Sequence, residues 1–269
     1  MHLGSLARRL SMVIGNGLVV MFFSEFFFLN EGPVLELLSL TEQGNLFNTL
    51  MYLLEFGIVW YGFLCVVWLP LLIHQYNVRS IWALFVVGVF VGWSIEGLLV
   101  PLIYTEDFIW PAIAWHVPID IFLGWWLIRL AFQKNHIWTS ISITTLLGLV
   151  WGVFATWWGW SAEPIGLLTI SQFATFAFTT TCVWITGMML IDRFGGDEFA
   201  PNKIELTLYI LLALALWSMW FMQFGVITLV VPVFVAIALY TLRKNSRIET
   251  RPNILHTLNN NRIAWWNYP

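Results

Sequence analysis

Residues 80–104 read SIWALFVVGVFVGWSIEGLLVPLIY, and Glu96 is the one Asp, Glu, Lys, Arg or His in this stretch. A helix that crosses roughly 30 Å of hydrocarbon needs about 20 mainly apolar residues, so the stretch is long enough to span a membrane. A helix also satisfies its backbone hydrogen bonds internally, which the water-free layer requires. The stretch therefore predicts a membrane-spanning helix that carries one carboxylate into the bilayer.

Seven further stretches have a similar length and apolar character. Composition agrees, because 59% of the residues are hydrophobic and only 10% are charged, whereas soluble proteins average about 25% charged residues. The expected spans are 11–30, 49–74, 80–104, 109–132, 137–160, 166–192, 204–224 and 225–242. We expect an all-α, polytopic integral membrane helix bundle of about eight transmembrane helices within residues 1–242. The last two spans have almost no loop between them, so a single re-entrant hairpin is the alternative there.

The basic residues predict the orientation of the bundle, because Lys and Arg near span ends are retained on the cytoplasmic side. With a cytoplasmic N-terminus, all 12 Lys and Arg fall on the cytoplasmic side: Arg8, Arg9, Arg79, Arg129, Lys134, Arg193, Lys203, Arg243, Lys244, Arg247, Arg251 and Arg262. The outer loops then carry acidic charges, at Glu31, Glu36, Glu42, Glu106, Asp107 and Glu163. Both termini are therefore expected in the cytoplasm of a multi-pass protein of the cell membrane.

The polar C-terminal tail, residues 243–269, is expected on the cytoplasmic side as well. It contains several Asn and Arg residues, with Trp265 and Trp266 near its end. Such a segment is expected to lie on the membrane surface or to dock on a partner.

Away from the span ends, five acidic or histidine side chains lie inside the expected spans, at Glu25, Glu55, Glu96, His116 and Asp120. A charge inside hydrocarbon is costly, so such residues usually face the protein interior or water and carry function. At about 1.5 Å per residue the first four lie roughly 8 to 12 Å below the outer boundary, and Asp120 lies near the midplane. Four helices are thus expected to place ionisable groups in one layer of the outer half of the bilayer.

The fourth span supplies two of these groups, since His116 and Asp120 are four residues apart and share one helix face. Pro118 lies between them, where it removes a backbone hydrogen bond and tends to kink the helix. Glu96 lies on the preceding span, which forms an outer hairpin with the fourth. Glu96 and His116 are therefore expected to meet, and the candidate catalytic residues are Glu96, His116, Asp120 and Glu55.

The candidate substrate-binding residues surround this layer. They are Glu25, Tyr104, Trp115, Gln172 and Thr175, the last two on a polar face of the sixth span. Ordinary structural roles stay open for each group: Glu25 can reach the headgroups, the Thr side chains can make interhelical contacts, and Glu96 with His116 and Asp120 can form a packing network.

Metals, cofactors and nucleic acid receive little support from the sequence. One histidine with several carboxylates suits a hard or borderline divalent ion, but no ligand spacing is diagnostic, so metal and cofactor stay unassigned. His74, at the inner end of the second span, is too far in depth from His116 to share a haem with it. The basic residues are few and dispersed, which argues against a nucleic-acid partner.

Three classes of function remain. The leading hypothesis is an enzyme acting by acid-base or metal-assisted chemistry on a lipid-like or small hydrophobic substrate in the lipid phase, with Glu96 as principal proton donor or base and His116 as its partner. A proton-coupled small-molecule transporter would use the same groups as a relay, helped by helix breaks at Pro101 and Pro118. The inner halves of the spans offer it few polar residues. The third class is a noncatalytic subunit of a membrane complex, with membrane lipids and other subunits as partners.

Overall fold

The computed structural model describes residues 3–29, 31–105, 112–161, 169–196, 198–246 and 252–269. Every regular element within these ranges is a helix. Several residues used in the orientation argument lie outside the described residues: Glu106, Asp107, Glu163, Arg247 and Arg251.

The helices follow the expected spans in order along the chain. They are α1 (Leu3–Met21), η1 (Phe22–Phe26), α2 (Glu31–Glu42), α3 (Leu46–Leu54), η2 (Glu55–Val66), α4 (Trp68–Gln75), α5 (Ile81–Ser94), η3 (Ile95–Leu99), η4 (Pro101–Tyr104), η5 (Ala112–Leu127), α6 (Ile128–Phe132), α7 (Ile137–Ser161), α8 (Ile170–Met189), η6 (Leu190–Phe194), α9 (Lys203–Phe224), η7 (Gly225–Leu229), α10 (Val230–Asn245), α11 (Ile254–Asn259) and η8 (Trp265–Asn267). Of the η segments, η4, η7 and η8 are 3₁₀ helices and the others are π-helical. The sequence predicts an outer loop where α2 lies, and this short helix is a finding of the structure.

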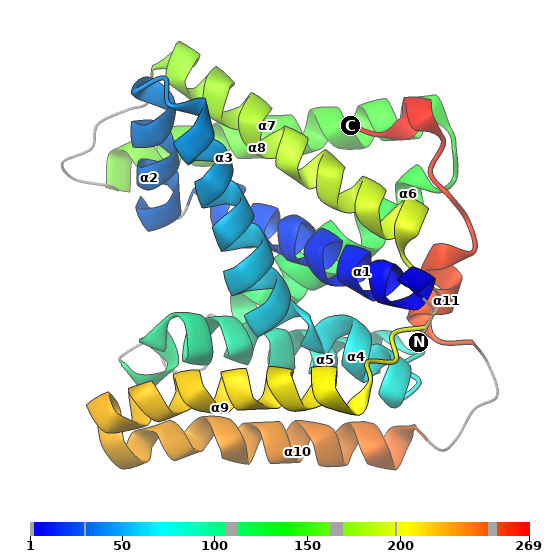
Figure 1. The fold of residues 1–269 in the computed structure, drawn as a ribbon. Coiled ribbons are helices and arrows are strands. Elements are labelled where there is room, and N and C mark those ends of the chain that lie inside the picture. The colour runs from blue at the N-terminus through cyan, green and yellow to red at the C-terminus, as the bar shows by residue number, and fades with distance from the viewer. Residues whose placement is uncertain (1–2, 30, 106–111, 162–168, 197, 247–251) are drawn as a thin grey trace.

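Seven helical stretches are long and apolar enough to cross a membrane. Six of them match six expected spans, and the seventh, Lys203–Asn245, has 43 residues and covers the last two. The chain reverses at Gly225, whose φ of 67° glycine adopts without strain. As a result α9 and α10 run antiparallel, side by side (Figure 1). The expected all-helical architecture with helices of membrane-spanning length is confirmed.

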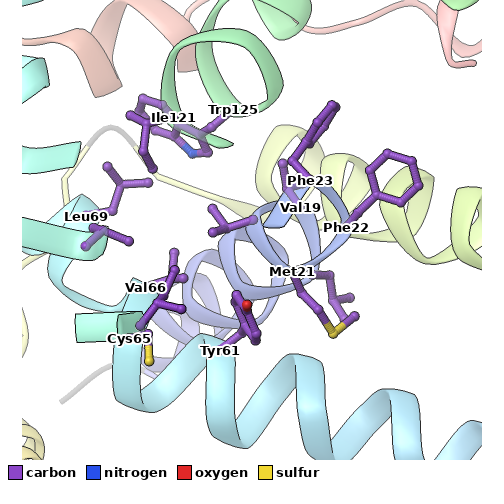
Figure 2. Packing of buried hydrophobic residues seen from close by; sticks show 14 of the residues in the cluster. Val19, Met21, Phe22, Phe23, Tyr61, Cys65, Val66, Leu69, Ile121 and Trp125 are labelled. Carbon is purple, nitrogen blue, oxygen red and sulfur yellow. The ribbon is translucent and has the colours of Figure 1, made fainter. Parts of the chain in front are cut away.

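α1 lies inside the bundle, where it packs against η2 and α8. A Cβ atom on Gly17 would lie 2.4 Å from the carbonyl oxygen of Gly57 and 2.6 Å from Cα of Gly62, so these backbones touch directly. On the other side, Gly15 meets the backbone of Gly187. Figure 2 shows part of the apolar packing, with Tyr61 of η2 lying next to Met21 of α1. Small residues at both interfaces permit the close approach that membrane helices use in place of a hydrophobic driving force.

Gly17→Leu is expected to lower the melting temperature of the purified protein strongly. Overpacking a well-packed interior typically costs about 1–3 kcal/mol, and here the added atoms meet backbone, which cannot rotate away. The matched control is Gly148→Leu on the exposed side of α7, where a Cβ meets no atom within 4 Å. Equal melting temperatures for the two variants would contradict this packing.

The C-terminal segment 252–269 docks on the bundle itself. Figure 1 shows it running along the end of the molecule that holds the N-terminus and the start of α9, opposite α2. Arg129 donates to the Asn259 side chain at 2.6 Å, and the Arg193 guanidinium lies 4.2 Å from the centre of the Trp265 ring. The Tyr268 hydroxyl donates to Asp192 at 2.9 Å. The tail was expected on the membrane surface or on a partner, and the structure instead shows it pairing buried polar groups at the ends of α6 and η6.

Tyr268→Phe is expected to destabilise the protein near neutral pH, and this effect should shrink at alkaline pH. Burial, with the Asp192 carboxylate beside it, raises the pKa of Tyr268 above its ordinary value. The hydroxyl therefore contributes stability below the unfolded pKa of about 10, and this is lost as pH rises through the higher folded pKa. Melting curves of both proteins from pH 7 to 12 measure it. A gap between them that stays constant with pH would rule out this role for Tyr268.

Candidate functional site

Glu96 on η3 and two residues of η5 form a hydrogen-bonded chain inside the bundle. Nε2 of His116 lies 2.7 Å from Oε1 of Glu96, and Nδ1 of His116 lies 2.7 Å from Oδ2 of Asp120. All three are buried, with relative exposures of 7%, 5% and 0% in the order Glu96, His116, Asp120. The expected contact between Glu96 and His116 is present, and the imidazole bridges two carboxyl groups from neighbouring helices.

The protons in this chain can be counted from its geometry. Two hydrogen bonds require two protons, whether the imidazole donates both or one comes from a carboxylic acid. Two carboxylates with an imidazolium carry one net negative charge, and so do one carboxylate, one neutral imidazole and one carboxylic acid. Shifting both protons along the chain therefore moves a proton equivalent between Glu96 and Asp120 without changing the net charge.

A hydroxyl arm from η1 and η2 adjoins this chain. Ser24 Oγ lies 3.4 Å from Nδ1 of His116 and 2.9 Å from the Tyr61 hydroxyl oxygen. The same hydroxyl donates to a carboxylate oxygen of Glu25. Glu25 is thus buried and linked to the chain through Tyr61 and Ser24, as part of one polar network that draws on four segments.

Each member of this polar network lies on a π-helical segment. Ser24 and Glu25 lie on η1, Tyr61 on η2, Glu96 on η3, and the fourth-span pair on η5, which also contains Pro118. π-helical turns are rare and are frequently found at functional sites. A wider turn changes which side chains share a face, so these segments help to set the directions of the polar groups.

One oxygen of each terminal carboxyl group is left over. Oε2 of Glu96 and Oδ1 of Asp120 are buried, and neither has a hydrogen-bond partner among the described residues. Buried polar atoms are nearly always paired with protein or water, so each free oxygen marks a place for a water molecule or a polar group of a ligand. The chain thus ends in a buried, unpaired oxygen on both sides.

Other candidates from the sequence lie apart from this chain. Glu55 was expected in the shared acid layer, but its side chain is exposed and has the Trp60 indole N–H 3.4 Å away. It begins η2 at a suitable depth and faces outward. Gln172 donates to Glu42 near the outer end of the bundle, and Thr175 is exposed.

Tyr104 and Trp115 flank the site rather than join it. The Tyr104 hydroxyl donates to the Gly97 carbonyl at 2.7 Å, next to Glu96 in the chain, and so holds the end of η3. Trp115 is 49% exposed and packs edge-on against Phe28, with ring centres 5.0 Å apart. In this structure Tyr104 supports the backbone near Glu96, and Trp115 faces the surface.

Polar groups also continue toward the inner end, contrary to the expectation that the inner halves of the spans are poor in them. Trp125 donates to the buried Asn16 at 2.7 Å, and Arg129 and Gln133 are buried one and two turns further along. Arg129 lies 4.0 Å from Asp192. The positions 116, 120, 125, 129 and 133 recur every four or five residues, a spacing that could have identified this stripe from the sequence. In the sequence Arg129 indicates only the orientation of the span, so the stripe was not among the predictions.

Within the described ranges, no group of three or more His, Cys, Asp or Glu side chains is arranged so that it could hold a metal ion. Both ring nitrogens of His116 are engaged by carboxyl groups, so an ion there would first have to displace one of them.

Comparison of the chain with protein-family models, with curated proteins and with solved structures gives no match.

Proposed function

We propose that this protein is a membrane-embedded enzyme that transfers protons to or from a lipid-phase substrate. The observation that carries the proposal is the bridging imidazole of His116, 2.7 Å from a carboxyl oxygen on each side, with one free oxygen beyond it at either end. General acid-base catalysis needs a positioned group and a place for the proton to go. The chain supplies both.

In the proposed mechanism Glu96 exchanges a proton with the substrate through Oε2, so the acid form of the chain carries this proton in addition to the two in its hydrogen bonds. When Glu96 protonates the substrate, His116 returns a proton from Nε2 to Glu96 and takes one at Nδ1 from Asp120. The reverse shift follows when Glu96 acts as a base. Asp120 thus serves as a proton reservoir and fixes the orientation of the imidazole. The hydroxyl groups of Ser24 and Tyr61 support the side of the ring that faces Asp120.

The proposed substrate is lipid-like or a small hydrophobic molecule. Glu96 lies within a predominantly apolar span, Ile81–Leu99, and it is surrounded by membrane-length helices. A substrate dissolved in the bilayer can approach from the side, whereas a polar metabolite would need an aqueous path. Membrane lipids are therefore both the solvent and the proposed source of substrates.

We also propose eight crossings with both termini in the cytoplasm. α9 and α10 each have enough residues for most of a span, and they run antiparallel. Basic residues of separate connections meet the C-terminal segment at one end: Arg8 and Arg79 line a cavity with His256, Arg129 contacts Asn259, and Arg193 contacts Trp265. Gathering of basic groups at one end supports a cytoplasmic location for that end.

The experiment compares the lipids of membranes that contain wild-type protein with those that contain Glu96→Gln or His116→Asn. Glu55→Gln is the matched control, because it removes an exposed carboxylate from a neighbouring helix. We expect a product that wild type and Glu55→Gln both form and that the two site variants do not. Growth in heavy water should label that product with deuterium if a proton is added at carbon. Identical lipid profiles in all four membranes, at equal protein levels, would refute the proposed enzymatic activity.

A proton-coupled transporter is the second candidate, favoured by the buried polar groups inward of Asp120, from Asn16 and Trp125 to Arg129 and Asp192. A carrier of this kind predicts proton movement across the membrane of reconstituted vesicles, measured with an enclosed pH-sensitive dye. Movement that Asp120→Asn abolishes would favour the carrier. Product formation without proton movement would favour the enzyme.

A further inference from the structure

We propose a second binding site, for a phosphate-bearing anion, in the cavity between the N-terminus and the C-terminal segment. The cavity has a volume of about 1220 Å³. Its charged and titratable lining comes from α1, from the end of α4 and the α4–α5 connection, from the segment before α9 and from α11, at Arg8, Arg9, His74, Arg79, Glu198 and His256. It lies at the end of the bundle opposite α2, away from the outer carboxylates (Figure 1).

The charge balance of the cavity lining favours an anion. Among the described residues of the lining, three guanidinium groups face one carboxylate, that of Glu198. Arg9 is already held by Glu205, with hydrogen bonds of 2.9 and 2.7 Å. Arg8 and Arg79 have no acidic partner among the described residues, so two positive charges remain for a ligand.

Arg79 gives the more specific indication. Its Nε is buried and makes no hydrogen bond within the described part of the chain. A basic residue kept only for membrane orientation would be expected to extend into water, where each of its donors is solvated. Arg79 also lines the cavity, so its terminal N–H groups can meet an acceptor that enters there.

Phosphate oxygens suit this arrangement best. A guanidinium forms parallel, charge-assisted hydrogen bonds with phosphate, and two such groups from different segments can hold one phosphate from two sides. His74 and His256 add ring nitrogens on the same lining. The phosphate could belong to an anionic lipid headgroup or to a free phosphate compound, because both present the same oxygens.

The test uses full-length protein in nanodiscs and two probes. Inorganic phosphate binding is measured by equilibrium dialysis in phosphatidylcholine nanodiscs. Retention of phosphatidylglycerol is measured by native mass spectrometry on protein released from nanodiscs that contain both lipids. The double variant Arg8→Gln with Arg79→Gln removes the free guanidinium groups. Lys244→Gln is the matched control, since it removes one exposed basic charge at the end of α10, outside the cavity lining.

A second variant keeps every charge and fills the space. Gly4 lines the cavity, and a Cβ there would meet no atom within 4 Å, so Gly4→Trp can place a ring in the cavity without a backbone clash. We expect wild type and Lys244→Gln to bind at least one probe, the double variant to bind it at least about tenfold more weakly, and Gly4→Trp to lose it. If the double variant fails to fold, Gly4→Trp decides the question.

The two probes also distinguish the sources of phosphate. Retention of phosphatidylglycerol alone identifies a lipid headgroup, and binding of inorganic phosphate alone identifies a free anion. If wild type binds neither probe, or if wild type and Gly4→Trp bind equally, the proposal of a phosphate-binding site is overturned. Neither result bears on the outer proton-transfer site, whose residues these variants leave unchanged.

Discussion

His116→Ala is expected to lower the free energy of unfolding by about 3–5 kcal/mol, the usual cost of removing one partner from a buried ion pair. The imidazole is the partner of two carboxyl groups at once, so its loss leaves both without their hydrogen bonds in the interior. Denaturation of the purified protein in detergent, followed by tryptophan fluorescence, measures the change. The matched control is His136→Ala, which truncates an exposed histidine just before α7.

A second change tests the physical reason for that loss. Adding Asp120→Asn to His116→Ala removes one of the stranded carboxylates, so the double variant is expected to recover part of the stability. Because the two side chains touch, their effects should be non-additive. Additive losses from His116→Ala and Asp120→Asn would mean that the two groups do not share a proton-coupled contact.

Glu96→Gln is expected to reduce formation of the lipid product by about 10²- to 10⁴-fold, the usual contribution of a general acid or base. Glutamine retains the size and a hydrogen bond to His116, so the melting temperature should change far less than in His116→Ala. Turnover per molecule of protein, measured on the product found in the lipid comparison, gives the effect. Glu55→Gln should keep wild-type turnover, and an equal loss in both glutamine variants would remove Glu96 from its assigned role.

The sequence predicted the contacts that follow from helix periodicity and depth. His116 and Asp120 meet because residues four apart share a face. Glu96 meets His116 because two helices joined by a short outer connection place residues of equal depth in the membrane side by side. Both arguments need only the rise per residue and the topology.

Facing direction around each helix was not predictable in the same way. Glu55 has a suitable depth, but it points outward, because rotation about the helix axis depends on which residues pack inward, such as Gly57 against α1. The Ser24 and Tyr61 arm was missed for a similar reason, since neutral hydroxyls in apolar runs give no charge signal. Docking of the C-terminal segment depends on partners far apart in the chain, such as Arg129 with Asn259, and no local pattern encodes such a pairing.

The bridging imidazole can be tested most directly by ¹⁵N NMR of histidine-labelled protein, with the His116 signals assigned by their loss in His116→Ala. Each ring nitrogen should respond to its own carboxyl partner. Glu96→Gln is expected to shift Nε2 most, Asp120→Asn is expected to shift Nδ1 most, and Glu55→Gln should shift neither. If the ¹⁵N chemical shifts of both His116 ring nitrogens are unchanged in Glu96→Gln and in Asp120→Asn, the hydrogen-bonded chain on which the proposed chemistry depends is contradicted.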